Sequence, residues 1–242
     1  MNVIGVSYDA VGVLHAFSEK YEITYPLLSD EGSKVIRSYG LFNTEAKPDS
    51  RGFGIPRPGI YIIDENLKVV EKHFEQSHRP RPTAENVLVM LLDKKLESNV
   101  KTFETSYLTG RIGITDTIAY RAQLLTAVVD IKLKDGFHVY GKPIPQGYIP
   151  LEIKFETNPN FEIDTFEFPK SKEFRIEALG ETFNILPDKI SLRTFLRIKN
   201  RPESGNYWVK ATVTFQACTD EVCMVPEKFK FEFPLRIVNQ RL

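Results

Sequence analysis

The apolar residues of the first hundred positions follow two different periods, which predict strands and helices in alternation. Continuous apolar runs at residues 3–6 and 60–63 predict strands that are buried on both faces. Apolar residues spaced three and four apart predict helices, among them one that opens at Asp30 and one that opens at Thr83. The expected order is strand, helix, short extended piece, helix, strand, strand and helix, which is an α/β domain over residues 1–96.

The second half of the chain alternates between apolar and polar residues at every second position. Residues 97–110 are polar and show no clear period, so they are expected to form a linker. Beyond them, alternating segments such as residues 207–215 predict strands with one buried face, separated by turn residues. About seven such strands within about 130 residues predict an all-β, immunoglobulin-like sandwich over residues 111–242.

Charge and hydropathy exclude two classes of partner. The chain has 242 residues, and its 32 Lys and Arg residues balance 32 Asp and Glu residues. A net charge of zero offers no basic surface for a phosphate backbone, so no nucleic acid is expected as a partner. No apolar run is long enough to span a membrane, and the first residues lack the pattern of a signal peptide.

The two cysteines, Cys218 and Cys223, are the candidates for chemistry. Their close spacing lets them bridge to each other, and Asp220 favours a turn between them. Close pairs in loops are more often redox-active or metal-binding than structural staples, although two packed core cysteines remain an alternative. Zinc would need two further ligands, and the nearest His in the sequence is His138, so neither a metal nor another cofactor is expected.

Four phrases of the first domain together resemble one family of peroxiredoxins. They are VIGVSYD (3–9), FSEKY (17–21), YPLLSD (25–30) and GIPRPGIYIID (54–64). In order and spacing they resemble the alkyl hydroperoxide reductase/thiol-specific antioxidant (AhpC/TSA) family, whose members have a thioredoxin fold. The resemblance covers about residues 2–95.

This resemblance implies that a strand and the helix with the family's nucleophilic cysteine precede the point where the chain begins. The first domain is therefore expected to be an incomplete thioredoxin-like fold, with a reading frame that continues upstream of Met1. A degenerate domain that closes its sheet differently is the alternative. Because residues 1–217 contain no Cys, residues 1–96 are expected not to reduce peroxide unaided.

The same resemblance draws attention to Pro58 and its neighbour Arg57. Pro58 falls where thioredoxin-like folds place a proline, often cis, that faces the active-site thiols, and many peroxiredoxins have an Arg there instead. The two residues are therefore candidates for supporting a redox site. The sequence leaves open whether Pro58 is cis in a functional turn or an ordinary proline before a strand.

Two phrases of the second domain carry a further resemblance. Residues 134–141 (KDGFHVYG) and 213–218 (VTFQAC), followed by Cys223 and Pro226, resemble the N-terminal immunoglobulin-like domain of the DsbD thiol:disulfide interchange proteins, over roughly residues 112–238. The resemblance implies that the two cysteines are a redox pair that exchanges electrons with thioredoxin-like or DsbD-like protein thiols. It also implies an extracytoplasmic, periplasmic location for the full-length protein, with a cytoplasmic location as the alternative.

His138 and Tyr140 belong to these phrases and are expected to approach the pair and to orient or protonate it. Placement in the core or on the surface, without such a role, is the alternative. Asp220 and Glu221 would raise the pKa of a nearby thiol. The sequence therefore predicts a thiol–disulfide oxidoreductase that relays electrons through a cysteine pair in a surface loop. A non-catalytic interaction module with a structural disulfide is the alternative.

Overall fold

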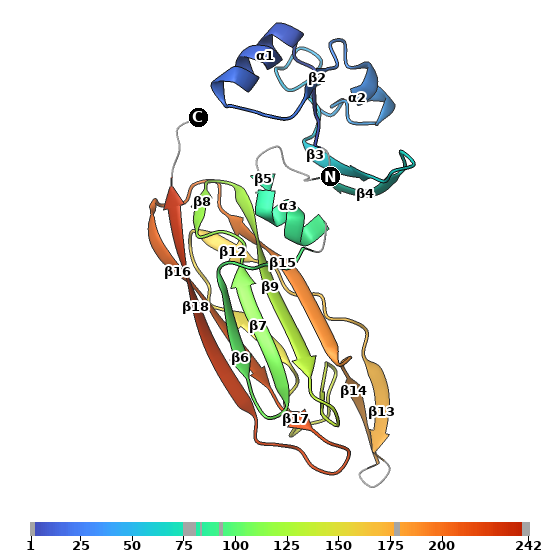
Figure 1. Cartoon of the computed structure of the whole chain (residues 1–242), viewed down its shortest axis with the longest axis vertical. Coiled ribbons are helices and arrows are strands. Elements are labelled where there is room, and N and C mark those ends of the chain that lie inside the picture. The colour runs from blue at the N-terminus through green and yellow to red at the C-terminus, as the bar shows by residue number, and fades with distance from the viewer. Residues whose placement is uncertain (1–2, 75–80, 83, 92–93, 177–179, 239–242) are drawn as a thin grey trace. The chain divides into compact units, whose positions relative to one another are not determined.

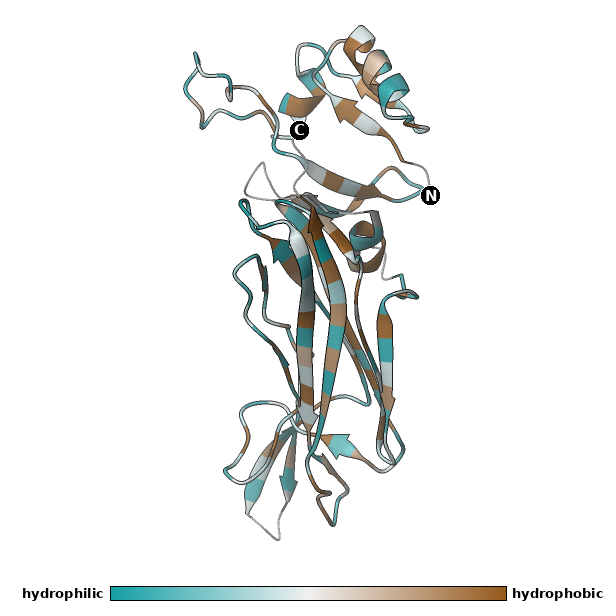
Figure 2. Ribbon diagram, turned by 90° about the vertical axis from the view of Figure 1, so that its left-hand side faces the viewer, coloured by the Kyte–Doolittle hydropathy of each residue, from teal (hydrophilic) through white to brown (hydrophobic). Residues whose placement is uncertain are grey.

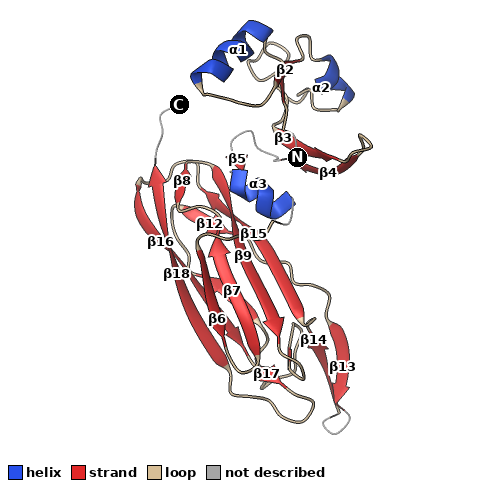
Figure 3. Cartoon of the chain, viewed as in Figure 1, coloured by secondary structure: helices blue, strands red, loops and turns tan. Residues whose placement is uncertain are grey.

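The computed structural model describes residues 3–74, 81–82, 84–91, 94–176 and 180–238. The chain divides into two compact units, Met1–His78 and Arg79–Leu242, and each is described by itself (Figure 1). Within these residues, helices are confined to three short segments, and most of the regular structure consists of strands (Figure 3).

The first unit is an α/β arrangement whose strands form two separate pairs. Its elements are β1 (Gly5–Ser7), α1 (Val11–Lys20), β2 (Leu27–Ser29), α2 (Lys34–Ser38), β3 (Gly59–Ile63) and β4 (Val69–Phe74). The pair β1–β2 is parallel and the pair β3–β4 is antiparallel, and within the described residues no ladder joins the two pairs. The order of elements follows the sequence expectation as far as Phe74.

The beginning of α2 shows how the sequence determines local structure in this unit. The carboxylate of Asp30 accepts hydrogen bonds from the backbone N–H groups of Val35 and Ile36, at 3.0 Å and 2.8 Å. These donors belong to the first turn of a helix and have no partner within the helix itself. The same hydrogen bonds lower the pKa of Asp30, against the opposing effect of its burial.

The strands of the first unit are more exposed than the apolar runs predict. Val6 of β1 and Leu28 of β2 are about half exposed, and so are Ile4 and Ile63. The expectation of strands buried on both faces is therefore wrong for these residues. The physical reason is that each strand has a single hydrogen-bonded neighbour, so one edge of each two-stranded ribbon remains open.

The second unit is a sandwich of two sheets. Its strands are β5 (Arg81–Pro82), β6 (Val100–Glu104), β7 (Leu108–Ile114), β8 (Ile118–Tyr120), β9 (Gln123–Leu133), β10 (His138–Val139), β11 (Glu152–Phe155), β12 (Phe161–Ile163), β13 (Lys172–Ile176), β14 (Glu181–Ile185), β15 (Lys189–Ile198), β16 (Gly205–Phe215), β17 (Ala217–Cys218) and β18 (Glu227–Val238). One sheet has the order β11-β16-β18-β8, and the other has the order β12-β15-β9-β7-β6 with β5 paired to β9.

Alternation along the long strands builds the core between these sheets. Figure 2 shows hydrophobic and hydrophilic residues alternating along the long strands of this unit. Buried side chains of β9 and β15, such as Val129 and Leu192, belong to the same cluster as Val213 of β16 and Phe233 of β18. Strands β15, β16 and β18 thus bury every second side chain over most of their length, as the sequence pattern predicts, whereas β9 buries residues on both of its faces.

The boundary between the units differs from the expected one. The expected linker, residues 97–110, contains β6 and the first half of β7, which pair with each other in the six-stranded sheet. Strand β6 appears polar in the sequence because it is an edge strand that buries one side chain, Phe103, and exposes most of the others. The sandwich unit therefore begins near Arg79 rather than at residue 111.

The last helix of the expected α/β domain also belongs to the sandwich. Helix α3 (Ala84–Leu91) packs against β9, where Val89 joins Leu96 and Val128 in a small buried cluster. The side-chain amide of Asn86 donates a hydrogen bond of 2.7 Å to the hydroxyl of Thr126 within this contact. The helical periodicity is correct, but the apolar face covers the outer face of β9 instead of completing the first unit.

Candidate functional site

Cys218 and Cys223 form a disulfide bond at one end of the sandwich. Cys218 ends the short strand β17, and the chain turns back so that Cys223 faces it across an antiparallel bridge, with the two Cα atoms 4.0 Å apart. Among the described residues no cysteine is free. The bond that the spacing permits is therefore present.

The turn between the cysteines is organised by Thr219. Its hydroxyl oxygen accepts hydrogen bonds from the backbone N–H groups of Glu221 and Val222, at 3.3 Å and 3.1 Å. Its own N–H donates to the carbonyl of Val222 at 2.8 Å. The sequence predicts a turn here from Asp220. The turn is present, but Thr219 makes the side-chain hydrogen bonds to the backbone, which a Thr at the first position of a tight turn can do as an Asp can.

Gln216 fixes the loop that follows Cys223, a role that the sequence analysis missed. Its side-chain amide donates to the carbonyl of Met224 at 3.0 Å, and its side-chain oxygen accepts from the backbone N–H of Ile149 at 3.2 Å. Gln216 thus ties both flanks of the cysteine pair to a neighbouring loop. The available indication was its position two residues before Cys218.

The two cysteine residues differ in their exposure. Cys218 is fully buried, whereas Cys223 is partly exposed. The residues around Cys223 face solvent, with Val222 54% exposed and Val225 82% exposed. The expectation that the pair lies in a surface loop is therefore correct for Cys223 and for the turn, and wrong for Cys218, because β17 pairs with β10 and brings Cys218 into the interior.

His138 and Tyr140 lie directly beside the disulfide. Strand β10 pairs with β17 so that His138 is opposite Cys218. The hydroxyl of Tyr140 lies 3.8 Å from Sγ of Cys223 and 3.3 Å from Nε2 of His138. The structure thus brings together four of the six residues that the sequence singled out, and it connects three of them by hydrogen-bond contacts.

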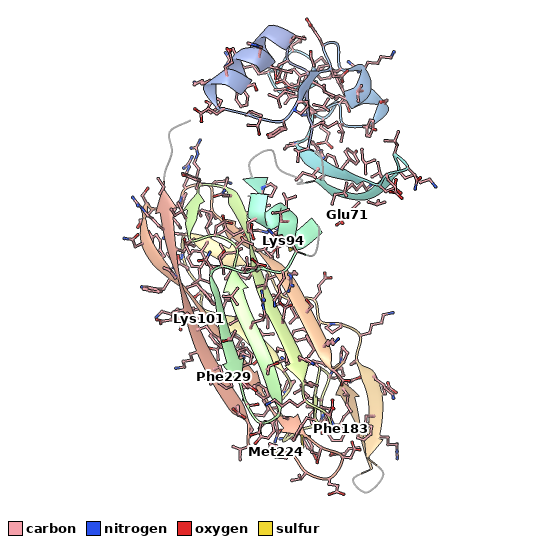
Figure 4. All side chains as sticks on the ribbon, viewed as in Figure 1. Glu71, Lys94, Lys101, Phe183, Met224 and Phe229 are labelled. Carbon is pink, nitrogen blue, oxygen red and sulfur yellow. A yellow bond between two sulfur atoms is a disulfide. The ribbon has the colours of Figure 1, made fainter. Side chains whose placement is uncertain are left out.

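Aromatic side chains enclose the inner side of the pair. The ring of Tyr140 stacks on Phe183 of β14 with a centroid distance of 4.8 Å, and Tyr148 contacts Phe183 edge-on at 4.8 Å. Tyr140, Phe183 and Cys218 form one buried cluster. Figure 4 labels Phe183 and Met224 in the part of the sandwich that holds β14 and β17. Phe183 is a site residue that the sequence analysis missed, because nothing near the cysteines in sequence indicates it.

Burial keeps both polar side chains neutral. Burial, together with the neighbouring Tyr148 and the carboxylate of Asp220, raises the pKa of Tyr140 to about 12. Burial lowers the pKa of His138, although Asp220 acts in the opposite direction. At neutral pH the site therefore contains an uncharged phenol and an uncharged imidazole, and each can donate a hydrogen bond.

Arg57 and Pro58 belong to the first unit, not to the unit that holds the disulfide. The guanidinium of Arg57 is paired with the carboxylate of Glu45. The only cis peptide bond among the described residues precedes Pro143, so the bond between Arg57 and Pro58 is trans. The alternative of an ordinary proline before a strand is the one that the structure shows.

The described part of the chain holds no group of three or more His, Cys, Asp or Glu side chains that could bind a metal ion. Within that same part, none of the helices combines the length and the apolar character needed to cross a membrane.

Comparison with known families confirms both resemblances. Residues 1–72 match the AhpC/TSA family, and residues 115–234 match the N-terminal part of the thiol:disulfide interchange protein DsbD. Helix α3 and strands β6 and β7 lie between or at the edge of these matches. The disulfide and the residues around it, including His138 and Tyr140, lie inside the DsbD match.

The similar curated proteins are peroxiredoxins. Peroxiredoxin Q of Arabidopsis thaliana is 33% identical over 89 residues, which are 37% of this chain and 38% of that protein. Peroxiredoxin Q of Suaeda salsa is 36% identical over 80 residues, which are 31% of this chain and 36% of that protein. The chain thus spans less than half the length of these relatives.

Among solved structures, the N-terminal periplasmic domain of ScsB from Proteus mirabilis aligns with a TM-score of 0.40 and 13% identity, over 58% of this chain and 52% of that one. The reduced DsbD N-terminal domain of Neisseria meningitidis aligns with a TM-score of 0.32 and 18% identity, over 46% of this chain and 77% of that one.

Proposed function

We propose that the protein is a thiol–disulfide oxidoreductase that relays electrons through the Cys218–Cys223 pair. The observation that carries this proposal is a disulfide in which Cys223 is a partly exposed residue between exposed neighbours, within the segment that matches the DsbD N-terminal family. A cystine that is buried throughout could not be attacked in the folded protein. Here a partner thiol can approach Cys223 without unfolding of the sandwich.

The exchange reaction begins at Cys223 because it is the more exposed cysteine of the pair. A partner thiolate attacks Sγ of Cys223, a mixed disulfide forms, and the sulfur of Cys218 leaves and takes up a proton. The second thiol of the partner then attacks its own sulfur in the mixed disulfide and releases Cys223 as a thiol. One protein disulfide and one partner dithiol thus become one protein dithiol and one partner disulfide.

The partners of this reaction are proteins with a thioredoxin-like or DsbD-like dithiol. The AhpC/TSA-like unit contributes no thiol of its own, because residues 1–217 contain no Cys. In the proposal, this unit connects the relay to peroxide-related chemistry. Arg57 and Pro58 are the residues of the unit that we propose to support a redox site. An extracytoplasmic location fits this proposal, because protein disulfides persist in oxidising compartments.

A second function, an interaction module with a structural disulfide, is favoured by one observation. Cys218 is fully buried beside Tyr140 and Phe183, as is usual for a cystine that never exchanges. The reduction potential of the pair separates the two functions. Exchangeable pairs lie between about −270 and −120 mV, whereas structural disulfides of secreted proteins lie below about −300 mV.

The experiment is equilibration of the full chain with defined glutathione buffers and with a thioredoxin-like dithiol protein, with thiols counted by mass spectrometry. We expect a potential in the exchangeable range. As a matched pair, a Cys218→Ser variant should trap a mixed disulfide with a single-cysteine partner, and a Cys223→Ser variant should not. A potential below about −300 mV, together with no trapped complex, would establish the structural alternative.

A further inference from the structure

The Tyr140 hydroxyl links the partly exposed cysteine of the pair to a buried imidazole. Its oxygen is 3.8 Å from Sγ of Cys223 and 3.3 Å from Nε2 of His138. Tyr140 is fully buried and His138 is 8% exposed, so the contact between these two side chains is buried, whereas the contact to Cys223 is partly buried. The three groups therefore form one short chain of hydrogen-bonding atoms that ends at the sulfur.

A hydroxyl group has one proton, so the imidazole decides where that proton points. If Nε2 accepts a hydrogen bond from the hydroxyl, the hydroxyl proton points at the ring and cannot be donated to the sulfur. If Nε2 carries the proton and donates it to the phenol oxygen, the hydroxyl proton remains free for the sulfur. We propose that His138 is a positioning residue: its Nε2–H donates to the Tyr140 oxygen, and this turns the Tyr140 hydroxyl proton toward Cys223 when the pair is reduced.

The hydrogen bond to Cys223 matters when the reduced pair delivers electrons to an acceptor protein, a step that rests on the proposed function. The Cys223 thiolate attacks the disulfide of an acceptor protein, one acceptor sulfur leaves and takes up a proton, and a mixed disulfide forms. The Cys218 thiol then loses its proton and attacks Sγ of Cys223, which releases the second acceptor sulfur as a thiol. The acceptor disulfide is reduced and the protein pair is oxidised.

The hydroxyl is needed because the other groups around Cys223 oppose a thiolate. Asp220 and Glu221 belong to the turn between the cysteines, and Asp220 is close enough to raise the pKa of both Tyr140 and His138. Tyr148 packs against Tyr140, and burial together with the nearby carboxylate of Glu181 of β14 raises the pKa of Tyr148. A negative sulfur in these surroundings gains stability from a donated hydrogen bond, and Tyr140 is placed to supply it.

The test measures the pKa of the Cys223 thiol in the reduced full chain. The rate of alkylation is followed from pH 5 to 10, and peptide mass spectrometry assigns it to Cys223. For Tyr140→Phe we expect the midpoint to rise by about 1 pH unit, because a hydrogen bond to the charged form is lost. His138→Phe, which cannot donate, should raise it in the same direction, and His138→Gln, whose amide can donate, should stay near the wild type.

The matched control is Tyr148→Phe, which removes a hydroxyl from the same aromatic cluster at a position that contacts Tyr140 and Phe183. It should leave the midpoint unchanged. An unchanged midpoint in Tyr140→Phe, or an equal rise in Tyr148→Phe, would overturn the role of the hydroxyl. A rise in Tyr140→Phe without one in His138→Phe would overturn the role of His138.

The outcome for the proposed function remains separate from these results. If the wild-type pair fails to exchange with a thioredoxin-like protein, the electron relay is refuted, whereas the alkylation midpoints still report the hydrogen bond. If the pair exchanges but the midpoints do not move, the relay stands and the positioning role of His138 is refuted. Reoxidation of each variant to an intact disulfide verifies that the site has folded.

Discussion

Reduction of the disulfide should weaken the sandwich only slightly. The bond closes a ring of the six residues from Cys218 to Cys223. On the chain-entropy relation, a loop of this size contributes about 2 kcal/mol to the free energy of unfolding. The main core cluster contains neither cysteine, and β16 and β18 pair with each other independently of the bond. The reduced protein is therefore expected to remain folded, as an electron relay requires.

The same estimate predicts a difference in reduction potential. Because 30 mV corresponds to about 1.4 kcal/mol for a two-electron couple, the pair in the folded chain should be about 45 mV more reducing than in the unfolded chain. The assay is urea unfolding of oxidised and reduced protein, combined with glutathione equilibration in native buffer and in denaturant. The dependence of the free energy of unfolding on urea concentration should be nearly equal for the oxidised and the reduced protein.

Phe183→Ala is the reference variant for the loss of a buried side chain. Phe183 is fully buried against Tyr140 and Tyr148, and its truncation should lower the free energy of unfolding by about 3–5 kcal/mol. If reduction of the disulfide costs as much as Phe183→Ala, or lowers the urea slope, the cystine holds the sandwich together and the reasoning from loop size is refuted. A cost near 2 kcal/mol with an intact slope supports it.

Three further outcomes are expected. Val89→Asp should destabilise the sandwich by about 3 kcal/mol or more in urea unfolding, because Val89 is buried against Val128, and an unchanged midpoint would separate α3 from the sandwich core. A variant with Ser at Cys218 and Cys223 should show no thiol-dependent peroxide reduction, and turnover at enzymatic rates would contradict the absence of a nucleophile in residues 1–217. Tyr140 keeps its proton to a higher pH in the folded than in the unfolded chain, so the free energy of unfolding should fall as pH rises from about 10 toward 12. Tyr140→Phe should remove that contribution. Equal pH dependence of the two proteins would show that Tyr140 titrates as it does in the unfolded chain.

Short-range patterns in the sequence are sufficient to predict several elements of this protein. Strict alternation in residues 207–215 predicted strand β16 and its buried face, because successive side chains of a strand point to opposite faces whatever its partner is. The spacing of Cys218 and Cys223 permitted the bond that is observed. The position of Asp30 before an apolar run predicted a helix at this point of the chain, because its carboxylate binds N–H groups of the first turn, although α2 itself begins four residues later, at Lys34.

Which surfaces these elements cover depends on long-range packing, which the sequence does not show. The period of residues 84–91 predicts a helix with an apolar face, but it cannot tell whether that face packs on the first unit or on β9. Residues 97–110 were expected to form a linker for a related reason. They contain β6, and an edge strand that buries only Phe103 has the polar sequence of a linker.

The candidate site combines both kinds of information. The cysteines and the His138–Tyr140 phrase could be identified from the sequence, but the contact between Tyr140 and Cys223 joins residues 83 positions apart. That contact depends on the pairing of β10 with β17, and the placement of Phe183 depends on β14. Long-range pairings leave no periodic trace in the sequence, because each strand shows which of its faces is buried and not which neighbour buries it.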